Sequence, residues 1–176
     1  NMDPALVNTC LLDDKERFYE EDPFTDELIT SFPITIVVHD SRYEYDLNRT
    51  PDMCIYEHAW GKKVWHKPHT EAQRSEILKK HFEYFSVLKV LLDKLEQLHG
   101  FSVVYDVHSY NYHRRMDASP VFNIGTRFVD MRKWKRDTET LTEGLNSIVL
   151  PNIDVDVGIN QVFIGAGYQS CFIQQN

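Results

Sequence analysis

The sequence has no long apolar run and no excess of positive charge, and each absence excludes a class of protein. No stretch approaches the roughly 20 consecutive apolar residues of a membrane-spanning helix, so we expect no membrane association. The 27 acidic residues outnumber the 19 basic ones and give a net charge of -8. Because phosphate binding needs a basic face, nucleic acid is not expected as the main partner.

Cysteine is also scarce. Cys10, Cys54 and Cys171 are an odd number, lie far apart, and lack the close pairs of a structural zinc site. The first residues, NMDPALVNTC, contain neither the basic nor the apolar region of a secretory signal peptide. We therefore expect reduced thiols and a cytoplasmic protein.

The length and the two ends bear on domain organisation. A chain of 176 residues buries enough surface for one domain without disulfides or structural metals. It begins with Asn ahead of Met, and its ending, CFIQQN, stops just after an apolar, strand-like run, with no cap. We expect a single domain over residues 1–176 that is an interior part of a longer protein, incomplete at both ends.

The first hundred residues predict strands followed by a long helix. The five mostly β-branched residues ITIVV at 34–38 predict a buried strand, and SRYEYDLNR at 41–49 predicts a further extended piece. Residues 50–70 show no clear period, so we expect a loop. Leu and Phe recur every three or four residues over 71–98, which predicts an amphipathic helix ended by Gly100.

The remaining elements complete an alternating pattern. The acidic stretch 13–31 predicts a helix start capped by Thr25. Further predictions are a strand at 101–107, a strand end and loop at 119–126, a helix at 130–147, and a hairpin or strand pair at 161–175. Helices that alternate with buried strands indicate an α/β fold with a mostly parallel sheet.

Polar side chains suited to catalysis gather in four places. These are the acids Glu20, Glu21 and Asp22; the string Arg42, Asp46, Asn48 and Arg49; the trio Asp106, His108 and His113; and the segment FNIGT, Phe122 to Thr126. Carboxylate and imidazole together can bind zinc with one coordination place left for water. An arginine beside an asparagine supplies the donors that grip a substrate carboxylate.

Each of these groups also has an ordinary structural explanation. An acidic run before a helix is most often a solvated cap, and a histidine after a strand is most often a hydrogen-bonded structural residue. An Asn-Arg pair is usually a surface turn with a salt bridge. Taken singly, none of the four groups identifies an active site.

Taken in order, the motifs resemble a known family. SRYEYDLNR, then YDVHSYNYH, then FNIGT resemble the Asp-Leu-Asn-Arg, Asp-X-His-Ser and Asn-X-Gly-Thr segments of the N-formylglutamate amidohydrolases. The resemblance runs from about Arg17 to Gly167. It implies a fold similar to the zinc exopeptidases of the phosphorylase/hydrolase type, with three layers: a central mixed, mostly parallel sheet flanked by helices.

The resemblance also implies site residues and one bound zinc ion. His108 and an acid, with Asp22 narrowly preferred to Glu21, are the implied metal ligands, and Asp106 would accept the other N–H of the imidazole. Asn48 and Arg49 are the implied anchors of the substrate α-carboxylate. A second carboxylate would meet Arg42, Arg114 or Arg115. Further implied substrate contacts are His113, Asn123 and Thr126.

The implied reaction is hydrolysis of N-formyl-L-glutamate, a small acyl amino acid, to formate and L-glutamate. The residues leave two alternatives open: a non-catalytic or degenerate member that binds acidic small molecules, and a carboxypeptidase or acylase of the same fold. Two family features are missing, because the first histidine motif would precede Asn1 and the catalytic glutamate would follow Asn176. His39 does not match the missing histidine, so this chain alone is expected to be nearly inactive.

Overall fold

The chain forms two compact units in the computed structural model, which describes residues 1–111 and 119–175. Unit 1 is Asn1–Tyr110 and unit 2 is Asn111–Gln175. The expectation of a single domain stays a prediction. Among the described helices, none is long and apolar enough to cross a membrane.

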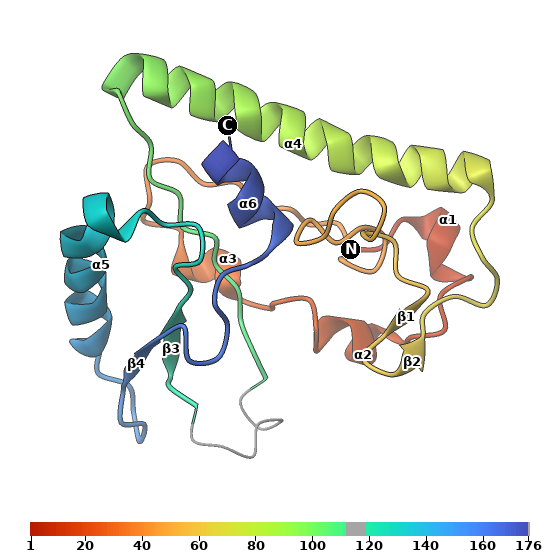
Figure 1. The fold of residues 1–176 in the computed structure, drawn as a ribbon. Coiled ribbons are helices and arrows are strands. Elements are labelled where there is room, and N and C mark those ends of the chain that lie inside the picture. Colours follow the sequence, from red (N-terminus) through yellow and green to blue (C-terminus); the bar gives the residue numbers. More distant parts are fainter. Residues whose placement is uncertain (112–118, 176) are drawn as a thin grey trace. The chain divides into compact units, whose positions relative to one another are not determined.

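Unit 1 consists of short helices, a small hairpin and one long helix (Figure 1). Its elements are α1 (Pro4–Val7), α2 (Asp14–Phe18), α3 (Thr25–Leu28), β1 (His58–Ala59), β2 (Lys62–Lys63) and α4 (Glu71–His99). The two strands form an antiparallel hairpin. A capping box begins α2: the Asp13 carboxylate accepts from Glu16 N at 2.8 Å, and the Glu16 carboxylate accepts in return from Asp13 N at 3.0 Å.

Helix α4 confirms the predicted long helix and its ends. A capping box between Thr70 and Gln73 starts it, and Gly100, with φ 80°, ends it in the left-handed conformation that glycine adopts without strain. The buried face is Ile77, His81, Phe85, Leu88 and Leu92. The predicted apolar stripe is therefore rotated, because His81 occupies a core position while Phe82 remains 54% exposed.

The core of unit 1 lies between these elements. It is formed by side chains from the N-terminal segment, the 43–65 region and the start of α4, namely Met2, Leu6, Leu12, Tyr43, Tyr45, Cys54, Ile55, Ala59, Val64, Trp65 and Ile77. Cys54 is buried there, and all three cysteines are free thiols, as expected. The region 50–70, predicted as loop, thus contributes a hairpin and much of the core.

Unit 2 is a small α/β unit. It contains β3 (Phe122–Ile124), α5 (Met131–Asn146), β4 (Val157–Ile159) and α6 (Tyr168–Gln175). Strands β3 and β4 pair in parallel, with Asn123 opposite Gly158, and α5 forms the crossover between them. The strand and the helix predicted around 119–147 are confirmed. The hairpin predicted at 161–175 is wrong, because its second half folds as α6.

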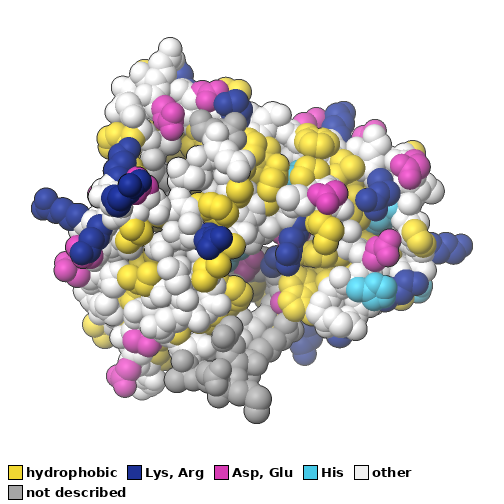
Figure 2. Space-filling model, in the orientation of Figure 1, with side chains coloured by type: hydrophobic (Ala, Val, Ile, Leu, Met, Phe, Trp, Pro, Cys, Tyr) yellow, Lys and Arg dark blue, Asp and Glu magenta, His cyan; other side chains and the backbone are white. Residues whose placement is uncertain are grey.

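Three predicted extended segments are not in any strand. Residues 34–38 and 101–107 belong to no ladder, and 41–49 forms turns. The apolar side chains of the first two segments are largely exposed, with Ile34 and Val103 each at 51%. Figure 2 shows hydrophobic side chains at the surface among charged ones. β-branched composition favours a strand only where a neighbour pairs with it, and the described residues provide none.

The α/β class is confirmed, whereas the three-layer arrangement around one central sheet is not. The described residues form two separate two-stranded sheets, one antiparallel and one parallel. Neither contains the segment before DLNR or the segment before HSY, so in this structure the motif residues of unit 1 are held by turns and side-chain bonds.

Candidate active site

A strained loop carries Asp22 into the site. Asp22 and Phe24 both have left-handed backbones, with φ 50° and 66°. Thr25 does not cap α3 as predicted; its hydroxyl instead donates to the Asp22 carbonyl at 2.8 Å, and Phe24 is the N-cap residue. A left-handed non-glycine residue costs roughly 1–2 kcal/mol, and such costs gather at functional sites.

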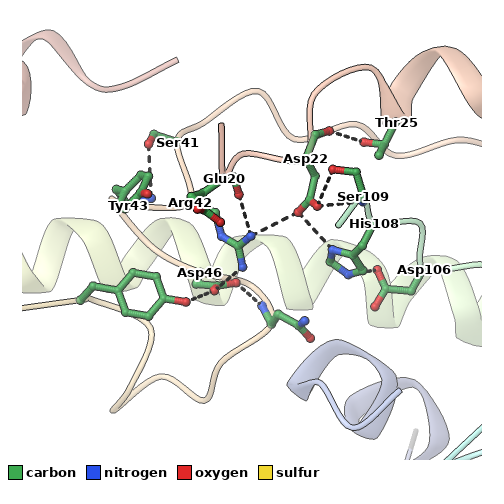
Figure 3. Close-up of polar contacts among 12 residues, drawn as sticks. Glu20, Asp22, Thr25, Ser41, Arg42, Tyr43, Asp46, Asp106, His108 and Ser109 are labelled. Carbon is green, nitrogen blue, oxygen red and sulfur yellow. Dashed lines mark hydrogen bonds and ion pairs between the residues drawn. The ribbon is translucent and has the colours of Figure 1, made fainter. Parts of the chain in front are cut away.

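His108 lies between two carboxylates (Figure 3). Its Nδ1 is 3.3 Å from Asp22 Oδ2, and its Nε2 is 3.1 Å from Asp106 Oδ1. The next residue, Ser109, donates to Asp22 Oδ1 from its backbone N–H at 2.8 Å and its hydroxyl at 3.2 Å. The HSY segment and the acidic loop, far apart in sequence, are thereby joined through one carboxylate.

These contacts shift the protonation of both partners. Burial alone would lower the pKa of His108, but hydrogen bonds to Asp106 and Asp22 raise it to about 10. Burial alone would raise the pKa of Asp22, but the hydrogen bond and charge of His108, the charge of Arg42 and the N–H of Ser109 lower it. These contacts therefore favour the ionised form of Asp22 and its pairing with the His108 ring.

Arg42 ties Asp22 to a second carboxylate. Its Nη1 donates to Asp22 Oδ2 at 3.3 Å and to the Glu20 carbonyl at 2.8 Å, while Nη2 donates to Asp46 Oδ2 at 2.8 Å (Figure 3). Burial alone would lower the pKa of Arg42, but Asp46 and Asp22 raise it. The charge that we expected to meet substrate is thus matched within the chain.

Asp46 is the most enclosed acid of the site, with a side chain 5% exposed. Besides Arg42 it accepts from Asn48 N at 2.8 Å and from the Tyr56 hydroxyl. Burial alone would raise the pKa of Asp46, whereas the charge and hydrogen bond of Arg42, with help from Tyr56 and Asn48, lower it. The DLNR turn is therefore built around an ionised aspartate.

Glu21 and Asp22, the two candidate acidic metal ligands, contact different residues. Glu21 accepts a hydrogen bond from the buried hydroxyl of Ser41, whereas Asp22 faces His108. Only Asp22 of these two therefore lies within 4 Å of an imidazole nitrogen of His108 in the described residues.

Asn48 and Arg49 follow Asp46 on the same turn. The Asn48 amide oxygen is buried and has no hydrogen-bond partner within residues 1–111 and 119–175. The Arg49 side chain is exposed, and among the same residues no carboxylate lies within ion-pairing distance of it. Its backbone carbonyl contacts the His81 ring at 3.1 Å, which fixes the turn on α4.

The predicted substrate contacts Asn123 and Thr126 of the FNIGT segment belong to unit 2, where both side chains are hydrogen-bonded to residues 160–163. Asn123 Oδ1 accepts from Gln161 N and Val162 N at 3.1 and 2.9 Å, and its amide nitrogen donates to Phe163 O at 2.8 Å. The Thr126 hydroxyl accepts from the Asn160 side chain at 2.8 Å. The predicted contacts His113, Arg114 and Arg115 lie outside the described residues.

The donor types at His108 suit a divalent metal. Two ligands of a tetrahedral zinc ion with bonds of about 2.0–2.1 Å are roughly 3.3 Å apart, which is also the distance from His108 Nδ1 to Asp22 Oδ2. Asp106 accepts from the opposite ring nitrogen, as a carboxylate does behind a metal-bound imidazole. The described residues hold no group of three or more His, Cys, Asp or Glu placed around one ion.

Three contributors were missed from the sequence. Ser109, Tyr56 and Trp60 contact Asp22, Asp46 and Arg42 respectively. Ser109 stands within the HSY motif and could have been found there. Tyr56 and Trp60 lie in the segment predicted as loop, where no local pattern marks them.

The site brings carboxylates, an imidazole and an arginine together in an α/β protein, and such a grouping of titratable side chains is typical of an enzyme active site. The family model of the N-formylglutamate amidohydrolases matches residues 1–175, so the chain belongs to that family. No curated protein and no solved structure matches the chain.

Proposed function

We propose that the protein is a metal-dependent hydrolase that cleaves the amide of an N-acylated acidic amino acid, with N-formyl-L-glutamate as the substrate and formate and L-glutamate as products. The observation that supports this most is the meeting of Asp22 and His108, which lie 86 residues apart in the chain and 3.3 Å apart at the site. A small-molecule substrate agrees with the family.

In this proposal His108 and Asp22 hold one zinc ion. A zinc ion held there would supply Lewis acidity for the acyl oxygen and would lower the pKa of a bound water towards neutrality. Asp106 fixes the imidazole by accepting its Nε2 proton, and Arg42 keeps Asp22 ionised and oriented. Glu21 is the less suitable ligand because it already accepts from Ser41.

Arg49 and Asn48 would bind the substrate. The Arg49 side chain is exposed, its side-chain partner Tyr56 is uncharged, and no carboxylate of the described residues forms an ion pair with it, so its charge is available to a substrate carboxylate. The neighbouring Asn48 amide has a buried oxygen that a substrate N–H could satisfy. We propose that Arg42 orients Asp22 and does not bind the substrate, because moving to the substrate would break its ion pairs with Asp22 and Asp46.

Metal content tests the proposal before any turnover is needed. The protein, expressed from its complete reading frame, is analysed for zinc beside His108→Ala and Asp22→Asn. His99→Ala is the matched control, because His99 is exposed at the end of α4 and outside the site. We expect near-stoichiometric zinc in wild type and control, and at least a tenfold weaker affinity in the two site variants.

Hydrolysis is then followed as release of the free amino acid from N-formyl-L-glutamate, N-acetyl-L-glutamate and N-formyl-L-glutamine. We expect the first to be cleaved fastest and the two site variants to lose activity with their metal. Zinc absent from the wild type would refute the metal dependence. Binding of N-formylglutamate without hydrolysis would instead support the alternative, a non-catalytic protein that binds acidic small molecules.

A further inference from the structure

Trp60 occupies a backbone position that is unfavourable for it. It is the first residue of the two-residue turn between β1 and β2, where Ala59 pairs with Lys62. Both turn residues have positive φ, 50° at Trp60 and 78° at Gly61. Such turns favour Asn, Asp or Gly at the first position, and a bulky side chain there is strained. The indole is therefore placed at a conformational cost.

The indole contacts the site arginine. Its ring centroid lies 5.2 Å from Arg42 Cζ, within the range of a cation–π interaction. The rings of Tyr43 and Tyr56 meet it edge-on, each with centroids 5.8 Å away. These contacts fix the indole against the guanidinium although 47% of Trp60 is exposed.

The guanidinium that Trp60 contacts is the link between two acids. Arg42 donates to Asp46 at 2.8 Å and to Asp22 at 3.3 Å, and Asp22 faces His108. An ion pair open to water is weakened by screening, whereas one with an apolar ring over the cation is strengthened. The longer bond, to Asp22, is the one that loosening of Arg42 would break first.

We propose that Trp60 is a positioning residue of the active site, which holds the Arg42 guanidinium in place and through it orients the Asp22 carboxylate toward His108. The consequence for catalysis rests on the proposed function, whereas the ordering of Arg42 does not. Because Trp60 contacts Arg42 directly and reaches the carboxylate anchor Arg49 only through Tyr56, its loss lowers kcat more than it raises KM.

Two variants test the proposal. Trp60→Leu keeps an apolar side chain but removes the aromatic face, and Trp60→Phe retains a smaller one. Trp134→Leu is the matched control, since Lys133 Nζ lies 4.8 Å from the Trp134 ring centroid in unit 2. Guanidinium NMR spectra report whether rotation of Arg42 is hindered, and Arg42→Lys assigns its signals. Formate release from N-formylglutamate gives kcat and KM.

We expect hindered Arg42 signals in wild type and Trp134→Leu, and averaging that increases from Trp60→Phe to Trp60→Leu, as Arg42 loosens from Asp22 while it keeps Asp46. The kcat of Trp60→Leu should fall about tenfold with KM within about twofold, and Phe should recover part of it. Hindered signals in Trp60→Leu, or an unchanged kcat, would overturn the proposal. If the wild type does not cleave N-formylglutamate, the proposed function fails, and the Arg42 signals alone then uphold or overturn the positioning role.

Discussion

At the scale of single residues, Asp46 holds the most connected position of the site. It accepts from Arg42, Tyr56 and the backbone of Asn48, and almost none of its side chain is in solvent. Removing one partner of a buried ion pair is costly because the remaining charge stays buried without compensation. The stability of this part of unit 1 should therefore depend on the Asp46 charge.

Asp46→Asn is expected to lower the free energy of unfolding by about 3 kcal/mol, because Arg42 would keep its burial and lose its nearer carboxylate. Urea denaturation followed by circular dichroism measures the loss. The control is Asp93→Asn, which breaks the 3.1 Å pair with Lys89 on the exposed side of α4 and should cost no more than about 0.5 kcal/mol. Equal losses in the two variants would contradict the buried ion pair.

The sequence predicted the types of the site residues better than their partners. Asp22 and His108 were both proposed as metal ligands and lie together, whereas Arg42 was proposed to meet substrate and faces two acids of the chain. The metal role of the first two stays a prediction. Motif order indicates which residues share a site, but whether a charge is matched internally depends on tertiary contacts that no local pattern encodes.

At the scale of elements, α4 is held on the DLNR turn by His81. The ring is fully buried, and its Nε2 lies 3.1 Å from the Arg49 carbonyl. Burial lowers the pKa of His81, and this outweighs the opposing effects of the Arg49 carbonyl and the Asp46 charge. The folded protein thus prefers the neutral imidazole, while the unfolded chain binds a proton near pH 6.5.

The contribution of His81 to stability is therefore present above pH 6.5 and is lost as the pH falls from there towards the lower folded-state pKa. Each unit of pKa depression costs about 1.4 kcal/mol at low pH. Denaturant unfolding of wild type and His81→Gln between pH 7.5 and 5 measures this. We expect the wild-type curve to fall more steeply below pH 6.5, and parallel curves would show that His81 does not titrate on unfolding.

The elements that the sequence predicted are those with local signals. Helix α4 has a cap, a period and a terminal glycine, and α5 has the Asp130 cap, so both were found. The strands predicted at 34–38 and 101–107 depended on partners elsewhere in the chain, and apolar composition cannot specify a partner. Helix α6 was missed because its apolar residues over 168–175 read equally well as a strand.

At the scale of the whole molecule, unit 2 depends on a close backbone crossing. A Cβ added at Gly125 would lie 2.4 Å from Gly165 N, where no flexible side chain can move aside. Around this crossing Asn123 and Asn160 bond to the neighbouring loop and strand end. Glycine is required at position 125 because the backbone segments around Gly125 and Gly165 come into contact there.

Gly125→Ala should destabilise unit 2 by about 3 kcal/mol, since the overlap involves backbone atoms. Hydrogen exchange with mass spectrometry should show lost protection in β3 and β4 and unchanged protection in α4 of unit 1. Gly144→Ala is the control, because its Cβ would meet nothing within 4 Å inside α5, and it should stabilise by up to about 1 kcal/mol. Protection lost equally in α4 would show that the two units unfold together.

The exposed segment 34–38 bears on self-association of the protein. ITIVV is short, uncharged, rich in β-branched residues and outside any ladder, which is the composition from which intermolecular β-sheets grow. Pro33 precedes it and Asp40 follows closely, and proline and charge at the ends of such a segment limit the extension of a foreign strand. Self-association through this segment should rise with protein concentration, with these flanking residues acting as its gatekeepers.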